Sequence, residues 1–187
     1  MQNHLRFVDE SDAAFILRLR SNPLLSKHLS ATSNRIEDQI NWIKKYKVRE
    51  RSGREYYYIY TEGDNRRCLY RLYNINNVSF TIGSWLFEPS KDFKTPMIID
   101  LLMGDIGFLH LKKPIMLFDV RKDNRRVIRY HGIKNPLLYN EDDHNNYYLI
   151  RAKDWCLSRS NVLKLLGMSE SEYDTLRNMI SITWPLD

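Results

Sequence analysis

The stretch Phe118-Asp119-Val120-Arg121-Lys122-Asp123-Asn124-Arg125-Arg126-Val127-Ile128 decides the fold. Its first residues continue the mostly apolar run Ile115-Met116-Leu117, which is typical of a strand buried on both faces. Asp123 is a favourable helix N-cap, so the sequence predicts a short helix over residues 124–131. A buried strand therefore leads directly into a helix at this point of the chain.

The residues before this stretch predict a three-stranded meander and a crossover helix. The strands lie over residues 56–60, 68–73 and 79–87, separated by turn-forming residues. Thr95 is a plausible N-cap and Pro96 a good first residue for a helix over residues 96–111. A crossover helix that joins a meander to a buried strand makes a mixed sheet with helices on both faces. The predicted fold class is therefore α/β with a mixed central sheet.

The two ends of the chain extend this pattern. A first strand over residues 5–8 precedes helices over residues 12–22 and 36–51, and Pro23 ends the first of them. After a turn-rich stretch from Gly132 to Asn146, the final strand covers residues 147–152. Two short helices follow Trp155, and Ser169 with Glu172 forms a capping box for the second. We expect residues 1–155 to form the main domain and residues 156–187 a helical extension packed on it.

Composition narrows the class of protein. The chain has 187 residues, enough for one domain, and no apolar run long enough to span a bilayer. The N-terminus lacks a signal-peptide pattern, so we expect a cytoplasmic protein. Cys68 and Cys156 stand far apart without neighbouring ligands, so neither a disulfide framework nor a metal site is expected. The net charge of +6 comes from basic pairs spread along the chain, which suits a phosphate-rich ligand as well as nucleic acid.

Three local sequences and the element order resemble one family. The first is Leu5-Arg6-Phe7-Val8 with Asp12-Ala13, followed by the Ile40-Asn41-Trp42-Ile43 helix. The second is Arg71-Leu72-Tyr73-Asn74-Ile75 with Ile82-Gly83-Ser84-Trp85-Leu86. The third is the stretch from Phe118 to Ile128. Together they are similar to the GNAT (Gcn5-related N-acetyltransferase) superfamily, its small-molecule and ribosomal-protein branch, over roughly residues 5–155.

The resemblance implies a site for acetyl-CoA where the fourth and fifth strands splay apart. Trp85, Leu86 and Phe87 would offer main-chain contacts to the pantetheine arm. The pyrophosphate would lie at the N-terminus of the helix that starts near Pro96, where free N–H groups and the helix dipole favour an anion. The side chains expected to support the cofactor are Lys91, Lys94, Thr95, Asn124 and either Arg125 or Arg126. Those expected to face the acceptor are Trp42, Ser84 and Tyr73.

Two departures from the family pattern concern the chemistry. The expected pyrophosphate loop, Lys91-Asp92-Phe93-Lys94-Thr95-Pro96, contains no glycine, and Pro96 lacks an N–H donor. His131 stands where the family has a tyrosine that protonates the CoA thiolate, and Tyr130 lies beside it. Either side chain could donate that proton. The candidate general bases are Glu88, Asp119 and His131, the last because of its ordinary pKa range.

The resemblance implies an N-acetyltransferase that transfers an acetyl group directly from acetyl-CoA to a primary amine of a small molecule. Amino-sugar nucleotides are the preferred acceptors, by analogy with related sequences. The alternatives are a protein N-terminal acetyltransferase and a GNAT-like binding module that has lost CoA, which the glycine-free loop favours. A nucleic-acid-binding domain is disfavoured because Asp and Glu are interspersed among the cations. No metal is expected, and a homodimer is compatible with the sequence.

Overall fold

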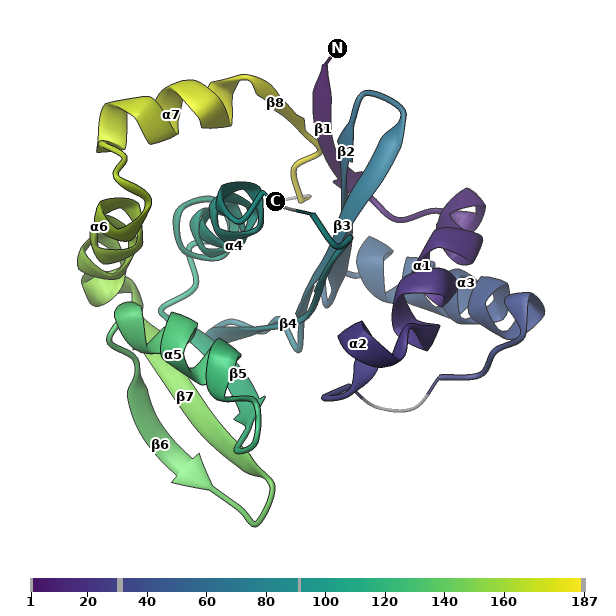
Figure 1. Cartoon of the computed structure of the whole chain (residues 1–187), viewed down its shortest axis with the longest axis horizontal. Coiled ribbons are helices and arrows are strands. Elements are labelled where there is room, and N and C mark those ends of the chain that lie inside the picture. Colours follow the sequence, from purple (N-terminus) through teal and green to yellow (C-terminus); the bar gives the residue numbers. More distant parts are fainter. Residues whose placement is uncertain (1, 30–31, 91, 186–187) are drawn as a thin grey trace.

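The structure, a computed structural model, describes residues 2–29, 32–90 and 92–185. Within these residues the strands form one mixed sheet of eight strands in the order β6-β7-β5-β4-β3-β2-β1-β8 (Figure 1). The strands are β1 (Asn3–Phe7), β2 (Tyr56–Glu62), β3 (Asn65–Tyr73), β4 (Ser79–Phe87), β5 (Ile115–Arg121), β6 (Leu137–Glu141), β7 (Asn145–Arg151) and β8 (Ile180–Ile182). β4 pairs with β5, and β1 with β8, in parallel; the other neighbours are antiparallel.

Helices cover both faces of the sheet, as the sequence predicts (Figure 1). On one face lie α1 (Ala13–Ser21), α2 (Pro23–Ser26) and α3 (Ile36–Arg51). On the other lie α4 (Lys94–Asp105), α5 (Arg125–Ile133), α6 (Trp155–Leu166) and α7 (Glu170–Asn178). The predicted α/β fold class is therefore confirmed.

Strand alternation divides the core into two layers. In β2, Tyr56, Tyr58 and Tyr60 belong to the large cluster under α4 and α6, whereas Tyr57 and Ile59 belong to the smaller cluster under α1 and α3. All five side chains are buried. The tyrosine run is thus a strand covered on both faces.

Three short elements were not expected from the sequence. β6 lies within residues 132–146, for which the sequence predicts turns. All of its residues are exposed, so they do not alternate between buried and exposed as those of a strand with one buried face do. β8 has only three residues. Pro23 does not simply end the first helix: it is the first residue of α2, whose N-cap Asn22 accepts a hydrogen bond from the Leu24 backbone N–H at 3.0 Å.

The crossover helix also differs from its prediction. α4 begins at Lys94, two residues before Pro96, and Thr95 is not its N-cap. The helix continues into a π-helical turn, Ile106–His110. Glycine is required near this junction, because a Cβ at Gly104 would lie 2.2 Å from the Trp155 ring. The missing side chain lets α6 pack closely on α4.

The C-terminal residues join the same sheet and core. β8 extends the sheet beside β1, pairing Asn3 with Ile180. The buried carboxylate of Asp105 accepts hydrogen bonds from Trp155 Nε1 at 2.8 Å, Tyr173 Oη at 2.8 Å and Arg159 at 2.9 Å. One α4 carboxylate therefore ties α6 and α7 to the crossover helix. Among the described helices, none is long and apolar enough to cross a membrane.

Candidate functional site

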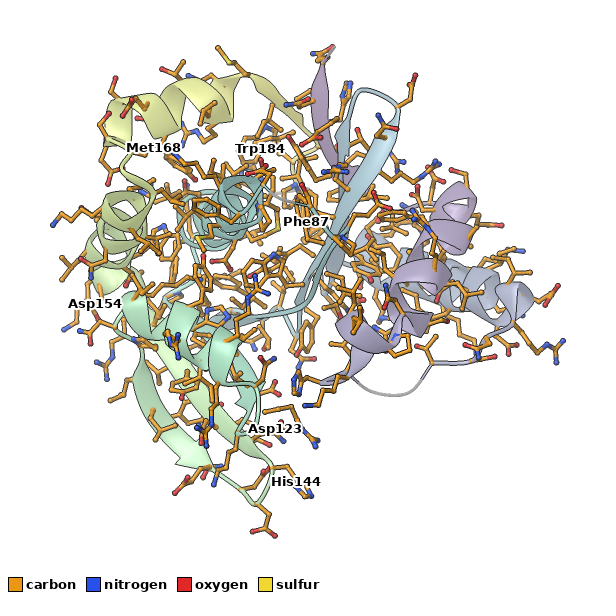
Figure 2. All side chains as sticks on the ribbon, in the orientation of Figure 1. Phe87, Asp123, His144, Asp154, Met168 and Trp184 are labelled. Atoms are coloured by element: carbon orange, nitrogen blue, oxygen red, sulfur yellow. The ribbon has the colours of Figure 1, made fainter. Side chains whose placement is uncertain are left out.

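β4 and β5 pair only at their beginnings. Ser79–Thr81 faces Ile115–Leu117 in parallel register, and beyond these residues the two strands no longer pair. β4 continues to Phe87, and Figure 2 shows that residue well apart from Asp123, just after β5. Where β4 diverges, its register with β3 shifts and Ser84 adopts a positive φ of 50°. The divergence leaves the β5-facing edge of β4 without a neighbouring strand.

His131 lies across this opening on the face covered by α4 and α5. Its ring centroid is 6.1 Å from that of Trp85 on β4 and 4.5 Å from that of Phe118 on β5. Burial, and next the Lys134 charge, lower the pKa of His131 to about 3. The expectation of an ordinary histidine pKa was therefore wrong, and the imidazole is neutral at physiological pH.

Two buried polar atoms belong to the rings that flank this opening. Among the described residues, neither Trp85 Nε1 nor His131 Nδ1 has a hydrogen-bond partner. Buried donors and acceptors are nearly always paired, so each of these unpaired atoms indicates a ligand or water position. The sequence predicts main-chain contacts between Trp85 and the cofactor. The indole N–H of Trp85 is a further polar group of the same residue.

Tyr130 belongs to a different, fully buried cluster. Its hydroxyl donates to Asp100 Oδ2 at 2.6 Å, and the Tyr70 hydroxyl and the Lys134 ammonium also contact that carboxylate. Burial raises the pKa of Tyr130 well above its ordinary value, and the Asp100 charge adds to the shift. A hydroxyl bound to a carboxylate and so hard to ionise is a poor proton donor. The geometry gives Tyr130 a structural role beside Trp85, whose ring it contacts.

The N-terminus of α4 is occupied by a side chain of the chain itself. Asp92 Oδ1 accepts hydrogen bonds from the backbone nitrogens of Lys94 at 2.9 Å and Thr95 at 3.3 Å. The free N–H groups expected there are thus paired, and Pro96 has none to add. Although burial raises the pKa of Asp92, hydrogen bonds from Thr95 and Lys94 hold it below its ordinary value. The carboxylate takes the place expected for a phosphate.

The other residues expected to hold the cofactor differ in position. Asn124 caps α5, where its Oδ1 accepts from the Val127 N–H at 3.3 Å, which leaves the amide nitrogen as a donor. Lys94 and Arg126 are exposed, whereas Leu86 is buried among the side chains under α1 and α3. Lys91 lies outside the described residues.

A cavity of about 360 Å³ lies on the opposite face, between α1, α3 and the sheet. Trp42 and Ser84, both expected to face an acceptor, line it together. Its other polar and aromatic lining includes Arg20, Gln39, Tyr57 and Arg71. Because Ser84 lies three residues past Thr81, the last β4 residue that pairs with β5, the cavity adjoins the strand opening.

Two arginines in this cavity were missed in the sequence. Arg71 Nε donates to the buried Glu55 at 2.6 Å, and its guanidinium lies 5.5 Å from the Trp42 ring and 4.6 Å from the Tyr73 ring. Arg20 donates to Thr32 Oγ1 at 2.7 Å. Alternation along β3 could have placed Arg71 beside Tyr73, since the two are separated by one residue. Tyr73 itself contacts Arg71 and is absent from the cavity lining.

The predicted base Glu88 lies between two cations. Its carboxylate is 2.5 Å from Arg18 and 3.5 Å from Arg67. Such a carboxylate already has its charge balanced, so the position favours an ion-pair role at the end of β4.

One further contact joins the two sides of the opening. His28, which follows α2, lies 3.2 Å from Asp123 in the β5–α5 loop. The helical layer of α1–α3 therefore contacts the β5 side of the opening.

Comparison with known proteins assigns this architecture. No family model and no curated protein sequence matches the chain. Among solved structures, the apo form of FdhC, described as a nucleotide-linked sugar GNAT, is 33% identical with a TM-score of 0.76; the match covers 89% of this chain and 96% of that one. Spermidine N-acetyltransferase from Vibrio cholerae, in complex with CoA and spermine, shares the fold at 16% identity and a TM-score of 0.68, covering 83% and 98%. At this identity and coverage the first match shows that the chain belongs to the GNAT superfamily of acyltransferases.

Proposed function

We propose that this protein transfers an acetyl group from acetyl-CoA to the primary amine of a nucleotide-linked amino sugar. The observation that carries the proposal is the meeting of two sites at Ser84: the strand opening on one side and the arginine-lined cavity on the other. A donor in the opening and an acceptor in the cavity would approach each other at the point where β4 bends. This arrangement suits direct transfer, which needs both reactants held in line.

The donor side is suited to an extended, amide-rich ligand. The unpaired edge of β4 can accept the pantetheine arm as an added strand, with hydrogen bonds to main-chain groups. Trp85 Nε1 and His131 Nδ1 supply polar atoms that lack protein partners among the described residues. An acyl thioester placed beside them would satisfy at least one of the two.

The acceptor side is suited to a nucleotide diphosphate. Arg20 and Arg71 bring two guanidinium groups to one cavity, and guanidinium is the side-chain group that best matches phosphate oxygens. Trp42 and Tyr57 add aromatic surface for a base or a sugar ring. The relative described as a nucleotide-linked sugar GNAT supports this choice of acceptor.

A second candidate function rests on Asp92. Because this carboxylate occupies the α4 N-terminus, a GNAT-like binding module that no longer uses CoA is the alternative. Calorimetric titration with acetyl-CoA and with CoA separates the two. Binding in the micromolar range supports the enzyme, whereas the absence of heat at high micromolar acetyl-CoA overturns it and favours the module.

The acceptor is tested by measuring thiol release from acetyl-CoA with several amines. We expect turnover with a nucleotide-linked amino sugar, and little with the free amino sugar, spermidine or a peptide with a free N-terminus. Faster turnover with the peptide would instead favour a protein N-terminal acetyltransferase. Arg20→Gln should raise KM for the nucleotide sugar about tenfold, since a lost charged hydrogen bond costs about 1.5 kcal/mol. Arg54→Gln, on an exposed residue outside the cavity, is the control.

A further inference from the structure

We propose that Asp119 is the general base that takes the proton from the acceptor ammonium. The inference rests on the proposed function, because it assigns a role in that reaction. It concerns a carboxylate on β5, just past the last residue that pairs with β4.

Alternation along β5 places Asp119 on the acceptor face. Met116, Phe118 and Val120 point into the core under α4 and α5, so Asp119 points to the face covered by α1–α3. The parallel register that pairs Thr81 with Leu117 would set Gly83 opposite Asp119 if the strands stayed together. Asp119 therefore stands across the opening from the bend of β4, on the side of the cavity.

The neighbours of Asp119 connect it to the cavity. The Tyr73 ring lies against Gly83, where an added Cβ would meet Cε1 at 3.1 Å and the hydroxyl oxygen at 3.4 Å. The register of β4 and β5 would set Gly83 opposite Asp119, and after burial the Asp119 charge is the next cause that raises the pKa of the Tyr73 hydroxyl. The Tyr73 ring in turn lies against the cavity residue Arg71 at 4.6 Å. Within residues 2–29, 32–90 and 92–185, the polar groups that interact with Asp119 include Tyr73 from β3, its β7 pairing partner Tyr147 and Asp142 from the β6–β7 turn.

Asp119 is a carboxylate beside the opening that stays available as a base. In the described part of the chain, no cation lies within ion-pair distance of it. By contrast, Glu55 is held by Arg49 and Arg71, and Glu88 by Arg18 and Arg67. Asp38, which lines the cavity, accepts a hydrogen bond from Ser33 Oγ at 2.6 Å. Asp119 is an exposed residue of β5. Desolvation, and next the Asp142 charge, raise its pKa above the ordinary value, which is the direction that a base at neutral pH needs. His131 is excluded as a base, because its pKa of about 3 leaves it too weak.

Two protons leave the acceptor ammonium during the transfer. Asp119 takes one proton from the ammonium group, which frees the nitrogen lone pair to attack the thioester carbonyl carbon. The new C–N bond forms, the C–S bond breaks, and the second nitrogen proton goes to the departing sulfur to give CoA–SH. Asp119 then releases its proton to solvent. No oxidant, reductant or metal is needed.

The test is the pH dependence of kcat/KM for Asp119→Asn. In the wild-type enzyme we expect a plateau between the pKa of Asp119 and that of the amine, because the carboxylate supplies the missing base. In the variant only the unprotonated amine reacts, so the rate should fall at least about 100-fold at neutral pH and rise about tenfold per pH unit up to the amine pKa. Calorimetry should show unchanged acetyl-CoA binding in the variant.

Controls and contrary outcomes are defined by other variants. Asp143→Asn, at an exposed position in the β6–β7 turn, should keep wild-type kinetics. The inference is overturned if kcat/KM of Asp119→Asn at neutral pH is within threefold of the wild-type value. It is also overturned if the variant loses only acetyl-CoA binding. If Asp119→Asn does not fold, the pH dependence of kcat/KM of the wild-type enzyme is the deciding measurement. A wild-type kcat/KM that rises tenfold per pH unit up to the amine pKa, without a plateau, overturns the inference. Failure of the proposed function is distinct, since the wild-type protein would then neither bind acetyl-CoA nor release thiol.

Discussion

Asp92 Oδ1 lies 2.9 Å from the backbone nitrogen of Lys94, the first residue of α4. A helix N-terminus attracts anions because its first N–H groups lack partners within the helix. Here the chain supplies the anion itself, two residues before the helix starts. A pyrophosphate group that binds at this end has to displace the carboxylate or lie beside it.

Replacing Asp92 by asparagine should therefore tighten acetyl-CoA binding. The amide oxygen can still accept from Lys94 and Thr95, so α4 should begin at the same residue, while the repulsion between the carboxylate and the phosphates is removed. One charge at about 4 Å in a solvated site is worth about 1 kcal/mol, so we expect Kd to fall about fivefold.

Calorimetric titration measures this change. Asp64→Asn, in the exposed β2–β3 turn, removes the same charge elsewhere and should leave Kd unchanged. Equal or weaker binding by Asp92→Asn would show that the carboxylate does not compete with the cofactor.

Much of the fold could be predicted because its elements carry strong local signals. α3 (Ile36–Arg51) and β4 (Ser79–Phe87) have the predicted bounds, since helical spacing and strand-forming residues are clear in both. β6 lacks such a signal, because every one of its residues is exposed and Pro136 precedes it. Its pairing with β7 depends on the rest of the sheet, which local pattern does not report.

The site was predicted less completely than the fold. Trp42 and Ser84 were both expected near the acceptor, and the structure brings them to one cavity although α3 and β4 lie far apart in sequence. The low pKa of His131 could not be foreseen, because it depends on burial and on the Lys134 charge. Likewise, the contact of Asp92 with the α4 N–H groups is decided by where the helix begins, and helix ends are the least certain feature of a sequence prediction.

His131 should make the protein less stable as the pH falls. Its folded-state pKa of about 3 lies below the ordinary 6.5, so the unfolded chain binds the proton first. The free energy of unfolding should then decrease below pH 6.5 by about 1.4 kcal/mol per pH unit from this residue, down to about pH 3. The His131→Phe variant lacks this contribution, so its stability relative to wild type should rise by about 2 kcal/mol between pH 7 and pH 5.

Urea unfolding at several pH values measures the difference. His144→Asn, in the exposed β6–β7 turn, is the control and should follow the wild-type curve. If the free energy of unfolding of wild type and of His131→Phe changes with pH in parallel, the imidazole is not buried as a neutral group.

The buried ion pair between Lys134 and Asp100 should be essential for stability. Both side chains are inaccessible to solvent, and burial would raise the pKa of Asp100 if the Lys134 ammonium did not hold it below its ordinary value. Lys134→Met leaves the carboxylate with the hydroxyls of Tyr70 and Tyr130 and without a cation, so we expect a loss of about 3–5 kcal/mol in denaturant unfolding. Adding Asp100→Asn should recover part of that loss, because the neutral amide needs no cation. A Lys134→Met variant within about 1 kcal/mol of wild type would contradict the role of the pair.

Two glycines in helices should respond to alanine with opposite signs. In a helix interior, alanine is ordinarily favoured over glycine by about 0.5–1 kcal/mol. Gly132 in α5 is exposed, and a Cβ added there would meet nothing within 4 Å, so Gly132→Ala should stabilise the protein by about that amount. At Gly104 the new Cβ would lie 2.2 Å from the buried Trp155 ring, and the ring has no room to move without breaking its bond to Asp105.

Gly104→Ala should therefore destabilise the protein by about 1–3 kcal/mol despite the gain in helix propensity. Thermal unfolding of the two variants beside wild type measures the signs directly, and Trp155 fluorescence should change only in Gly104→Ala. Stabilisation by both substitutions would mean that α6 does not pack on α4 at the distance that the structure gives. Asp105 of α4 holds both α6, through Trp155, and α7, through Tyr173. Stabilisation by both substitutions would therefore also contradict the position of α7.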